Sequence, residues 1–513
     1  MNISMLIKND NRKTAVSLIT SIISSCLSFA VSFFLSPYIV ANFGEEANGF
    51  AQLASNFVNY ATLITVALNS MAARFIAIEY HKGDLKKCEK FYSSVFAGNL
   101  FIIAVLIGPA LFCVLNLESI LNIETANIFH IKLLFSFVFT NFFVALINSV
   151  LSVAVYVKNA QYLQNITNMA NIVLRAVGLL LLFTFFAPKV YYVSLTVMIL
   201  TLLSTPLFYY YKSKLLPEIK FNIKSFDIKA VWELISSGIW NTINQCGNLL
   251  MTGLDLLLSN LFIGPLQMGV LSVSKVLPNA IIHLAATVNT SFSPNLTIAY
   301  AAGDKNKILA SLRYAMKSSS LLVLLPIIVL SVYGKAFYGL WVPNMDASQL
   351  SMLSFLTCMQ FIPLAGTQAL YNVYTTANKL KWNSITVLVG GFVNFAVVYL
   401  LLKYTNLGLL AVVGVSSVVS LLRNLLFTIP YAAKILKLKW YTFYKEVGLS
   451  CLCGIVICVC CLISRMIIQP NGWISMILSV MLACILGFVS SFVILMNREE
   501  RGKWLKTFIR KNS

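Results

Sequence analysis

Four long apolar stretches of this 513-residue chain contain ionisable side chains well inside them. These side chains are Arg175, Asp255, Lys275 and Arg423, and His283 follows Lys275 in the same stretch. A charge at membrane depth costs about 2.5–3.5 kcal/mol on insertion scales, so such residues usually face a bundle interior or a hydrated cavity. Three cations against one carboxylate form a net positive set, which favours the binding of an anion such as a phosphate.

Polar neighbours recur around these charges with helical spacing. At about 100° per residue, side chains three or four positions apart lie on one face of a helix. Four stretches have such a polar face, and one hydrated cavity would satisfy all four. The faces consist of Gln164, Asn168, Asn171 and Arg175; Asn241, Gln245, Asn248, Thr252, Asp255 and Ser259; Ser272, Lys275, Asn279, His283 and Thr290; and Ser17, Ser21, Ser24, Ser28 and Ser32.

Other interpretations of these residues stay open. Serine faces often mark close helix packing, and intramembrane asparagines often bridge helices. Arg74 lies near a helix end, where an arginine can snorkel. His283 is more often a satisfied polar residue than a proton relay, and Asp255 is expected to pair with Lys275. The candidate substrate-binding cations are Arg74, Arg175, Lys275 and Arg423, and the candidate polar lining is Asn171, Asn241, Gln245, Asn248, Asp255, Asn279 and His283.

The composition places these residues in a membrane protein. Hydrophobic residues make up 59% of the chain and charged residues 11%, whereas soluble proteins carry about 25% charged residues. The net charge of +21 does not indicate a nucleic-acid partner, because most lysines and arginines sit in short gaps between apolar stretches and no nucleic-acid motif occurs. The eleven cysteines lack metal-ligand spacing, so neither a metal nor a cofactor is expected.

The apolar stretches predict an all-α polytopic membrane protein with about fourteen transmembrane helices, since a span needs about 20 apolar residues. The first stretch is too long for a cleaved signal peptide, so we expect it to be retained. The predicted spans are 14–40, 47–78, 91–116, 126–153, 162–187, 190–211, 230–262, 266–300, 309–336, 348–375, 382–403, 406–432, 446–468 and 472–496.

The distribution of basic residues predicts the orientation. With the N-terminus inside, outside segments and outer helix ends hold only Lys132, Lys189, Lys335, Lys403 and Arg465. The remaining lysines and nearly all remaining arginines outside the spans then lie inside, so both termini are expected in the cytoplasm of a bacterium with the chain in its cytoplasmic membrane. The basic C-terminal tail resembles an amphipathic helix on the inner leaflet.

An internal repeat relates the two halves of the chain. A shift of 220 positions places the second span and its exit loop on the eighth span without a gap. An even number of spans separates the copies, so they have the same orientation and are expected to be related by an axis along the membrane normal. The matching residues are Gly44 and Gly264, Gly49 and Gly269, Asn59 and Asn279, Asn69 and Asn289, Tyr80 and Tyr300, Gly83 and Gly303, Asp84 and Asp304, and Lys87 and Lys307.

The repeat predicts the domain organisation. Two lobes of six helices each are joined by a polar, basic segment, and two helices stand outside the repeat. The predicted parts are an N-lobe at 1–211, a cytoplasmic linker at 212–229, a C-lobe at 230–433, extra helices at 434–497 and a basic cytoplasmic tail at 498–513.

This architecture resembles the multidrug/oligosaccharidyl-lipid/polysaccharide (MOP) exporter superfamily, and within it the Wzx-type flippases of O-antigen or capsule repeat units. Besides the architecture over about residues 14–432, the resemblance rests on four short segments. They are 38–49 (YIVANFGEEANG), 73–77 (ARFIA), 81–84 (HKGD) and 302–305 (AGDK).

The resemblance implies a transporter rather than an enzyme. It implies alternating access that moves an undecaprenyl-pyrophosphate-linked oligosaccharide from the inner to the outer leaflet for cell-surface polysaccharide synthesis. Cavity cations would attract the pyrophosphate, and amide and hydroxyl side chains would bind the sugar. The implied partners are membrane lipid, the polyprenyl-linked sugar, and the polysaccharide polymerase and glycosyltransferases of the same pathway.

Three alternatives remain beside this interpretation. Fourteen helices also fit a lipid II-type flippase. A cation-coupled multidrug (MATE-type) exporter usually needs cavity carboxylates, and only Asp255 lies deep in a span. A membrane-embedded enzyme usually has long outer loops, which this chain lacks. No P-loop occurs, which argues against direct use of ATP, and the sequence names neither the sugar nor a coupling ion, whether H+ or Na+.

Reporter fusions test the predicted orientation. Because the positive-inside bias is consistent over every loop, a cytoplasmic reporter should be active inside and an export-dependent reporter outside. A reversed signal at Lys224 would contradict both the topology and the two-lobe organisation. The inside positions are Lys87, Lys224, Lys307 and Lys439, and the outside positions are Glu118 and Asp346.

Overall fold

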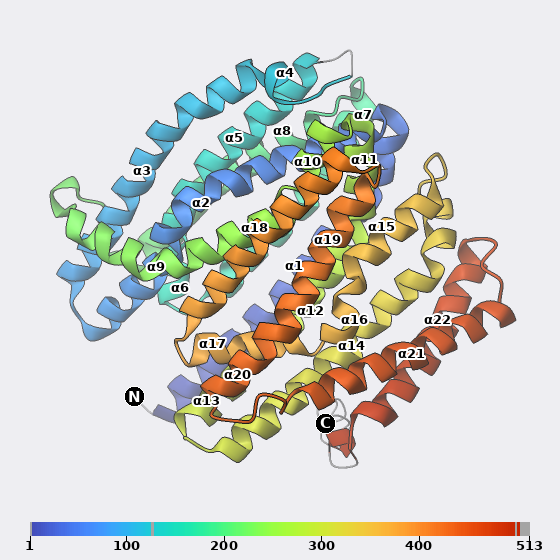
Figure 1. Cartoon of the computed structure of the whole chain (residues 1–513). Helices are drawn as coiled ribbons and strands as arrows, with labels where there is room; N and C mark the ends of the chain where they lie inside the picture. Colours follow the sequence, from blue (N-terminus) through green and yellow to red (C-terminus); the bar gives the residue numbers. More distant parts are fainter. Residues whose placement is uncertain (1–2, 125–127, 498–499, 503–513) are drawn as a thin grey trace. The chain divides into compact units, whose positions relative to one another are not determined.

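A computed structural model describes residues 3–124, 128–497 and 500–502, and all regular elements in this part are helical (Figure 1). The all-α class is therefore confirmed. The chain divides into two units: Met1–Leu249 with Gly264–Gly269 form the first unit, and Leu250–Ile263 with Val270–Ser513 form the second unit. The lobes at 1–211 and 230–433 are defined by the repeat and stay a prediction.

The first unit contains the N-terminal helices. Its long helices are joined by short turns, and a 3-10 turn lies in the predicted linker. The elements are α1 (Ile3–Phe43), α2 (Glu45–Lys82), α3 (Leu85–Leu115), α4 (Leu117–Ile120), α5 (Ile128–Leu151), α6 (Val153–Val157), α7 (Gln161–Phe185), α8 (Tyr192–Leu215), η1 (Ile223–Ser225) and α9 (Ile228–Asn248).

The second unit contains most of the later helices, and the chain enters it through a π-helical turn, η2 (Leu249–Gly253). A second π-helical turn, η4, separates α19 from α20. The elements are α10 (Asp255–Phe262), α11 (Pro265–Ser274), α12 (Val276–Ser291), α13 (Ser293–Ala301), α14 (Lys305–Trp341), α15 (Ala347–Met359), α16 (Phe361–Leu364), η3 (Thr367–Leu370), α17 (Tyr371–Thr376), α18 (Leu380–Tyr404), α19 (Leu409–Arg423), η4 (Asn424–Thr428), α20 (Ile429–Ile435), α21 (Tyr444–Ile467) and α22 (Trp473–Leu495).

The number of helices able to cross a membrane is close to the predicted fourteen. Within the described residues, twelve helices are long and apolar enough, or thirteen if the bent pair α11–α12 forms one span. The remaining predicted span, 230–262, is helical but divided into α9, η2 and α10. The 21-residue helix α9 is not among the twelve, because its second half carries asparagines and a glutamine.

The predicted repeat has a structural counterpart at the same offset of 220 residues. Helices α2 and α11 begin at residues 45 and 265, and α3 and α14 begin at 85 and 305. The turns before α3 and α14 contain Gly83 at φ +84° and Gly303 at φ +69°, a conformation that favours glycine. Asp84 and Asp304 then cap the two helices by accepting backbone N–H groups of Lys87 and Lys307.

Side-chain contacts repeat as well. Asn69 and Asn99 exchange hydrogen bonds between α2 and α3, at 3.1 and 2.9 Å. At the equivalent place, 220 positions later, the Ser319 hydroxyl of α14 donates to Asn289 of α12 at 2.7 Å. The same helix pair is thus joined by a buried polar contact in each half.

The linker is fixed to α3 by hydrogen bonds. The backbone N–H of Asn222 donates to Ser93, that of Asp227 donates to Ser94 at 3.0 Å, and the Ser225 hydroxyl donates to Glu89 at 2.9 Å. Lys90 forms an ion pair with Asp227. This lysine, together with the N–H of Lys229, holds the pKa of the Asp227 carboxyl below its ordinary value.

Helix α9 belongs to the first unit because it packs closely on α2. Gly238 is buried, and a Cβ added there would lie 2.1 Å from the carbonyl oxygen of Ala67. Small residues allow two membrane helices to approach this closely.

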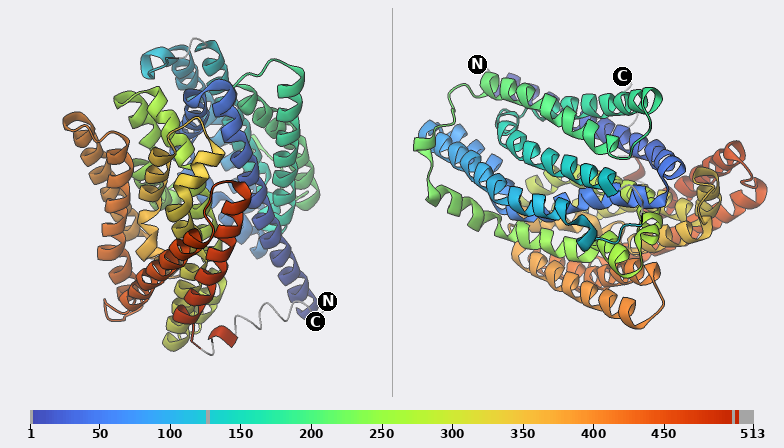
Figure 2. Two further views of the ribbon diagram at one scale, coloured as in Figure 1. Left: turned by 90° about the vertical axis from the view of Figure 1, so that its right-hand side faces the viewer. Right: turned by 90° about the horizontal axis from the view of Figure 1, so that it is seen from above.

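The two extra helices pack on α14 of the second unit (Figure 2). The hydroxyls of Tyr333 and Ser479 are 2.7 Å apart, and so are those of Ser320 and Ser450. One turn before Ser450, at the start of α21, the buried Glu446 forms an ion pair with Arg313 at 3.0 Å. Of the predicted tail, only residues 500–502 are described, and Glu500 pairs with Lys317; the rest lies outside the described residues.

Replacing Gly238 by alanine tests the packing of α9 on α2. The added Cβ would overlap the Ala67 carbonyl, so we expect a loss of about 1–3 kcal/mol and a lower midpoint of thermal unfolding for the detergent-purified protein. Gly108→Ala is the matched control, because Gly108 is also helical and nothing lies within 4 Å of its added Cβ. Equal midpoints for both variants would show that the close approach is absent.

Candidate functional site

Lys275 lies at a bend of 42° between α11 and α12. Pro278 follows three residues later and has no N–H to donate to the carbonyl of Ser274, which is therefore released from the helix. The Ser354 hydroxyl donates to this carbonyl at 2.7 Å, and the Tyr338 hydroxyl donates at 3.4 Å. The bend thus has a cause in the sequence, and the freed carbonyl has partners on α15 and α14.

Asp255 is the first residue of α10 and follows the π-helical turn η2. The side-chain amide of Asn394 on α18 donates to two carbonyls of this turn, Leu250 at 3.1 Å and Met251 at 2.9 Å. Such turns are often found at functional sites. Asn394 satisfies backbone groups that the turn exposes and thereby holds the start of α10 in place.

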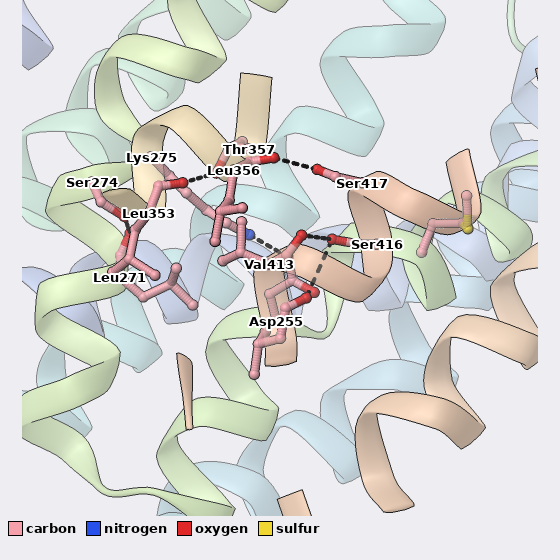
Figure 3. A network of polar contacts seen from close by, with 12 residues as sticks. Asp255, Leu271, Ser274, Lys275, Leu353, Leu356, Thr357, Val413, Ser416 and Ser417 are labelled. Carbon is pink, nitrogen blue, oxygen red and sulfur yellow. Dashed lines mark hydrogen bonds and ion pairs between the residues drawn. The ribbon is translucent and has the colours of Figure 1, made fainter. Parts of the chain in front are cut away.

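The two breaks bring Asp255 and Lys275 into a buried ion pair (Figure 3). Only 4% of the Asp255 side chain and 12% of the Lys275 side chain are exposed. Helix α10 packs on α19, where the hydroxyls of Ser416 and Ser417 bond to backbone carbonyls rather than to the pair. The predicted pairing is confirmed, so the positive charge of Lys275 is neutralised inside the second unit.

Arg423 is the last residue of α19 and precedes the second π-helical turn, η4. Its Nη2 donates to the Tyr371 hydroxyl and to Oδ1 of Asn424 at 3.2 Å. Its Nε and Nη1 are buried and have no hydrogen-bond partner. Among the described residues, no carboxylate forms an ion pair with this guanidinium, so its charge is not neutralised by the protein.

Arg175, on α7 of the first unit, also lacks a carboxylate partner among the described residues. It is half-buried, and its Nε is buried without a hydrogen-bond partner. One turn away, the Asn171 amide donates to the Ser204 hydroxyl of α8 at 2.9 Å. Asn171 therefore bridges two helices, as intramembrane asparagines often do, whereas Arg175 forms no ion pair.

The remaining candidates are more exposed. Arg74 on α2 is exposed, as are Asn279 and His283 on α12. Asn241 and Gln245 on α9 are half-buried, and Asn248 is exposed. The structure assigns Arg74, Arg175, Asn171 and the α9 residues to the first unit, and Asp255, Lys275, Asn279, His283 and Arg423 to the second.

One predicted polar face needs correction. The sequence placed Asn241, Gln245, Asn248 and Asp255 on one continuous helical face. The π-helical turn at Leu249–Gly253 interrupts that helix, so the α-helical angle of 100° per residue does not hold across it. Asn248 is exposed before the break and Asp255 is buried after it.

Sequence reasoning missed three polar residues of these sites. Asn394 holds η2, Tyr371 bonds Arg423, and the Asn244 side chain accepts from Asn248 at 3.0 Å. Asn244 has the i, i+4 spacing to Asn248 that could have identified it. Asn394 and Tyr371 are contributed by other helices, so spacing along one helix could not find them. No group of three or more metal-ligating side chains occurs among the described residues.

Comparisons with known proteins identify chains of similar sequence and structures of similar fold. No family model matches the chain. The uncharacterized membrane protein EpsK of Bacillus subtilis (strain 168) is 27% identical over 482 residues, 94% of this chain and 95% of that protein. The lipid II flippase MurJ in its inward closed conformation has a TM-score of 0.66 at 13% identity and covers 94% of this chain and 100% of its own.

Two further solved structures are transporters of the MOP superfamily. An inward-facing multidrug resistance MATE family transporter has a TM-score of 0.59 at 13% identity and covers 82% of this chain and 99% of its own. A transporter from Pyrococcus furiosus has a TM-score of 0.57 at 12% identity and covers 84% of this chain and 96% of its own. The chain therefore has the fold found in MOP-superfamily flippases and transporters, as the sequence predicted.

The coverage distinguishes these neighbours. Helix α21 begins at residue 444, so 443 of 513 residues, or about 86%, precede it. A match over 94% of the chain, as with MurJ, has to include part of α21–α22, whereas a match over 82% does not require them. The likeness to MurJ thus extends beyond residue 443.

Neutralising one member of the buried pair tests its role in stability. Asp255→Asn or Lys275→Met leaves the other charge buried without a partner, which costs about 3–5 kcal/mol. The double variant removes both charges, so its midpoint of thermal unfolding should lie above that of either single variant. Losses that simply add in the double variant would show that the two side chains do not interact.

Proposed function

We propose that this chain is a flippase that moves an undecaprenyl-pyrophosphate-linked oligosaccharide from the inner to the outer leaflet of the bacterial cytoplasmic membrane by alternating access, for cell-surface polysaccharide synthesis. The observation that carries the proposal is the contrast between the buried charges. Asp255 is neutralised by Lys275, whereas Arg175 and Arg423 form no ion pair with a described carboxylate. The net charge left for a ligand is positive, which suits an anion.

A pyrophosphate fits the chemistry of these two arginines. Guanidinium groups present several N–H donors in a fixed plane and bind phosphate oxygens in pairs. Both groups have buried N–H donors without a protein acceptor. An unsatisfied donor at membrane depth is costly, and a phosphate oxygen would supply the acceptor to either guanidinium. Arg74 and the uncharged residues of the predicted polar lining are assigned supporting roles in the same proposal, whereas Lys275 is neutralised by Asp255.

The comparisons support a lipid-linked substrate without naming it. The MurJ structure, described as a lipid II flippase, matches the chain over 94% of its length. The Pyrococcus furiosus transporter is described as having a binding pocket of reverse polarity that suggests a different function. That description links the polarity of the binding pocket to function in that protein, which supports using the charge of the unpaired arginines in the present proposal.

Two other functions compete with this proposal. A lipid II-type flippase would use the same anion chemistry and is favoured by the extension of the match to MurJ beyond residue 443. A cation-coupled exporter of the MATE type would need an available carboxylate at membrane depth, and the pairing of Asp255 with Lys275 argues against it. The proposal includes a polymerase and glycosyltransferases as pathway partners. It places both termini in the cytoplasm. It assigns no described residue to a coupling ion, whether H+ or Na+.

Substitution of the unpaired arginines tests the proposed substrate. Arg175→Gln and Arg423→Gln should each lower export about tenfold or more, since a hydrogen bond to a charged group contributes about 1.5–3 kcal/mol and 1.4 kcal/mol is tenfold. Arg→Lys at either site should retain part of the activity. Surface polysaccharide is measured in a flippase-null strain, with protein amounts checked on blots.

The control and the competing outcome use other residues of the chain. Arg465→Gln is the matched control, because Arg465 is exposed on α21 and its guanidinium donates to the carbonyl of Val332. The double variant Asp255→Asn/Lys275→Gln should keep export, since it removes a neutral pair. If that double variant is inactive at normal protein levels while both Arg→Gln variants stay active, cation export becomes the better account.

A further inference from the structure

Helix α9 presents a row of polar side chains without a charge. We call this row the amide face. Its members recur at spacings of three and four residues, so they lie on one sector of the helix. Ser237 and Asn248 are exposed, and the other three members are half-buried. The amide face consists of Ser237, Trp240, Asn241, Asn244 and Asn248.

The other sectors of this helix differ in composition. Leu234 and Gly238 are buried on a second sector, and α9 packs on α2. Ile228, Trp232 and Ile239 are exposed apolar residues on a third sector, which suits contact with lipid. The amide face lies between these two sectors and fits neither close packing nor hydrocarbon.

The amide face has the chemistry of a sugar site. Each asparagine both donates and accepts, and Ser237 adds a hydroxyl, so the face can bond to the hydroxyls of a sugar from either side. Trp240 offers a flat ring against which the apolar face of a pyranose can pack. The hydrogen bond of 3.0 Å between Asn248 and Asn244 fixes the direction of both amides. No cation belongs to the face, so it offers a pyrophosphate no ion pair.

We infer that the amide face of α9 binds the sugar portion of the transported lipid, as a neutral hexose or N-acetylhexosamine ring. This inference rests on the proposed flippase function and adds the substrate class and its contact surface. Glu233, exposed one turn before Ser237, continues the same sector. Its carboxylate repels acidic sugars and accepts hydrogen bonds from neutral ones, so neutral rings are selected over uronic acids.

Equilibrium binding to the purified full-length protein in nanodiscs tests this inference. The two probes are undecaprenyl pyrophosphate and undecaprenyl-pyrophosphoryl-N-acetylglucosamine, which differ in the sugar and in the one ionisable phosphate oxygen that the sugar esterifies. The wild type should bind the sugar-bearing lipid about tenfold more tightly, as expected for one or two additional neutral hydrogen bonds and a ring contact. Trp240→Ala/Asn244→Ala should bring this ratio close to 1 without weakening the bare lipid.

Two further variants act as controls for folding and position. Trp232→Ala/Ser236→Ala makes equivalent changes on the exposed surface of α9 outside the amide face, and it should keep the tenfold ratio. Trp240→Phe retains an aromatic ring and should keep most of the tenfold affinity ratio.

The outcomes separate this inference from the proposed function. If the wild type binds both probes equally, or if Trp240→Ala/Asn244→Ala keeps the ratio, the sugar site on α9 is overturned while the anionic lipid substrate stands. If the wild type binds neither probe, the proposed function fails and the sugar site fails with it. A ratio lost only in the amide-face variant supports both.

Discussion

Hydrocarbon offers no hydrogen bonds, so each polar group at membrane depth has to find its partner within the protein or in a ligand. The two helix breaks in the second unit illustrate this constraint. Pro278 frees a carbonyl, which Ser354 takes up; the π-helical turn η2 exposes two carbonyls, which Asn394 takes up. The same two breaks direct Asp255 and Lys275 at each other. The irregular parts of these helices are therefore part of the mechanism that neutralises the buried charge.

The constraint also shows where the protein leaves a group unsatisfied. Arg175 and Arg423 keep buried N–H donors without acceptors, although each has polar side chains within a turn of it. The carbonyls freed at the two helix breaks have side-chain donors, whereas these two guanidinium groups carry charge and keep N–H donors that an anionic ligand would satisfy. The proposal of an anionic ligand rests on this difference between two kinds of buried polar group in one structure, rather than on the net charge of the chain.

Much of this could be predicted from the sequence, because apolar length and helical spacing report on lipid and on helix faces directly. The all-helical class, the repeat offset of 220 residues and the pairing of Asp255 with Lys275 follow from such patterns. The π-helical turn at Leu249–Gly253 could not be predicted, since it is a change of hydrogen-bond register without a characteristic composition. For that reason the polar face was extended from Asn248 to Asp255, which the structure separates.

The repeat shows that the two halves have diverged at the charged positions. Helices α7 and α18 begin at 161 and 380, an offset of 219, and α8 and α20 end at 215 and 435, an offset of 220. The π-helical turn η4 lies before the end of α20 and accounts for the additional residue. Before that turn, at an offset of 219, Arg175 corresponds to Asn394 and Arg423 corresponds to Ser204.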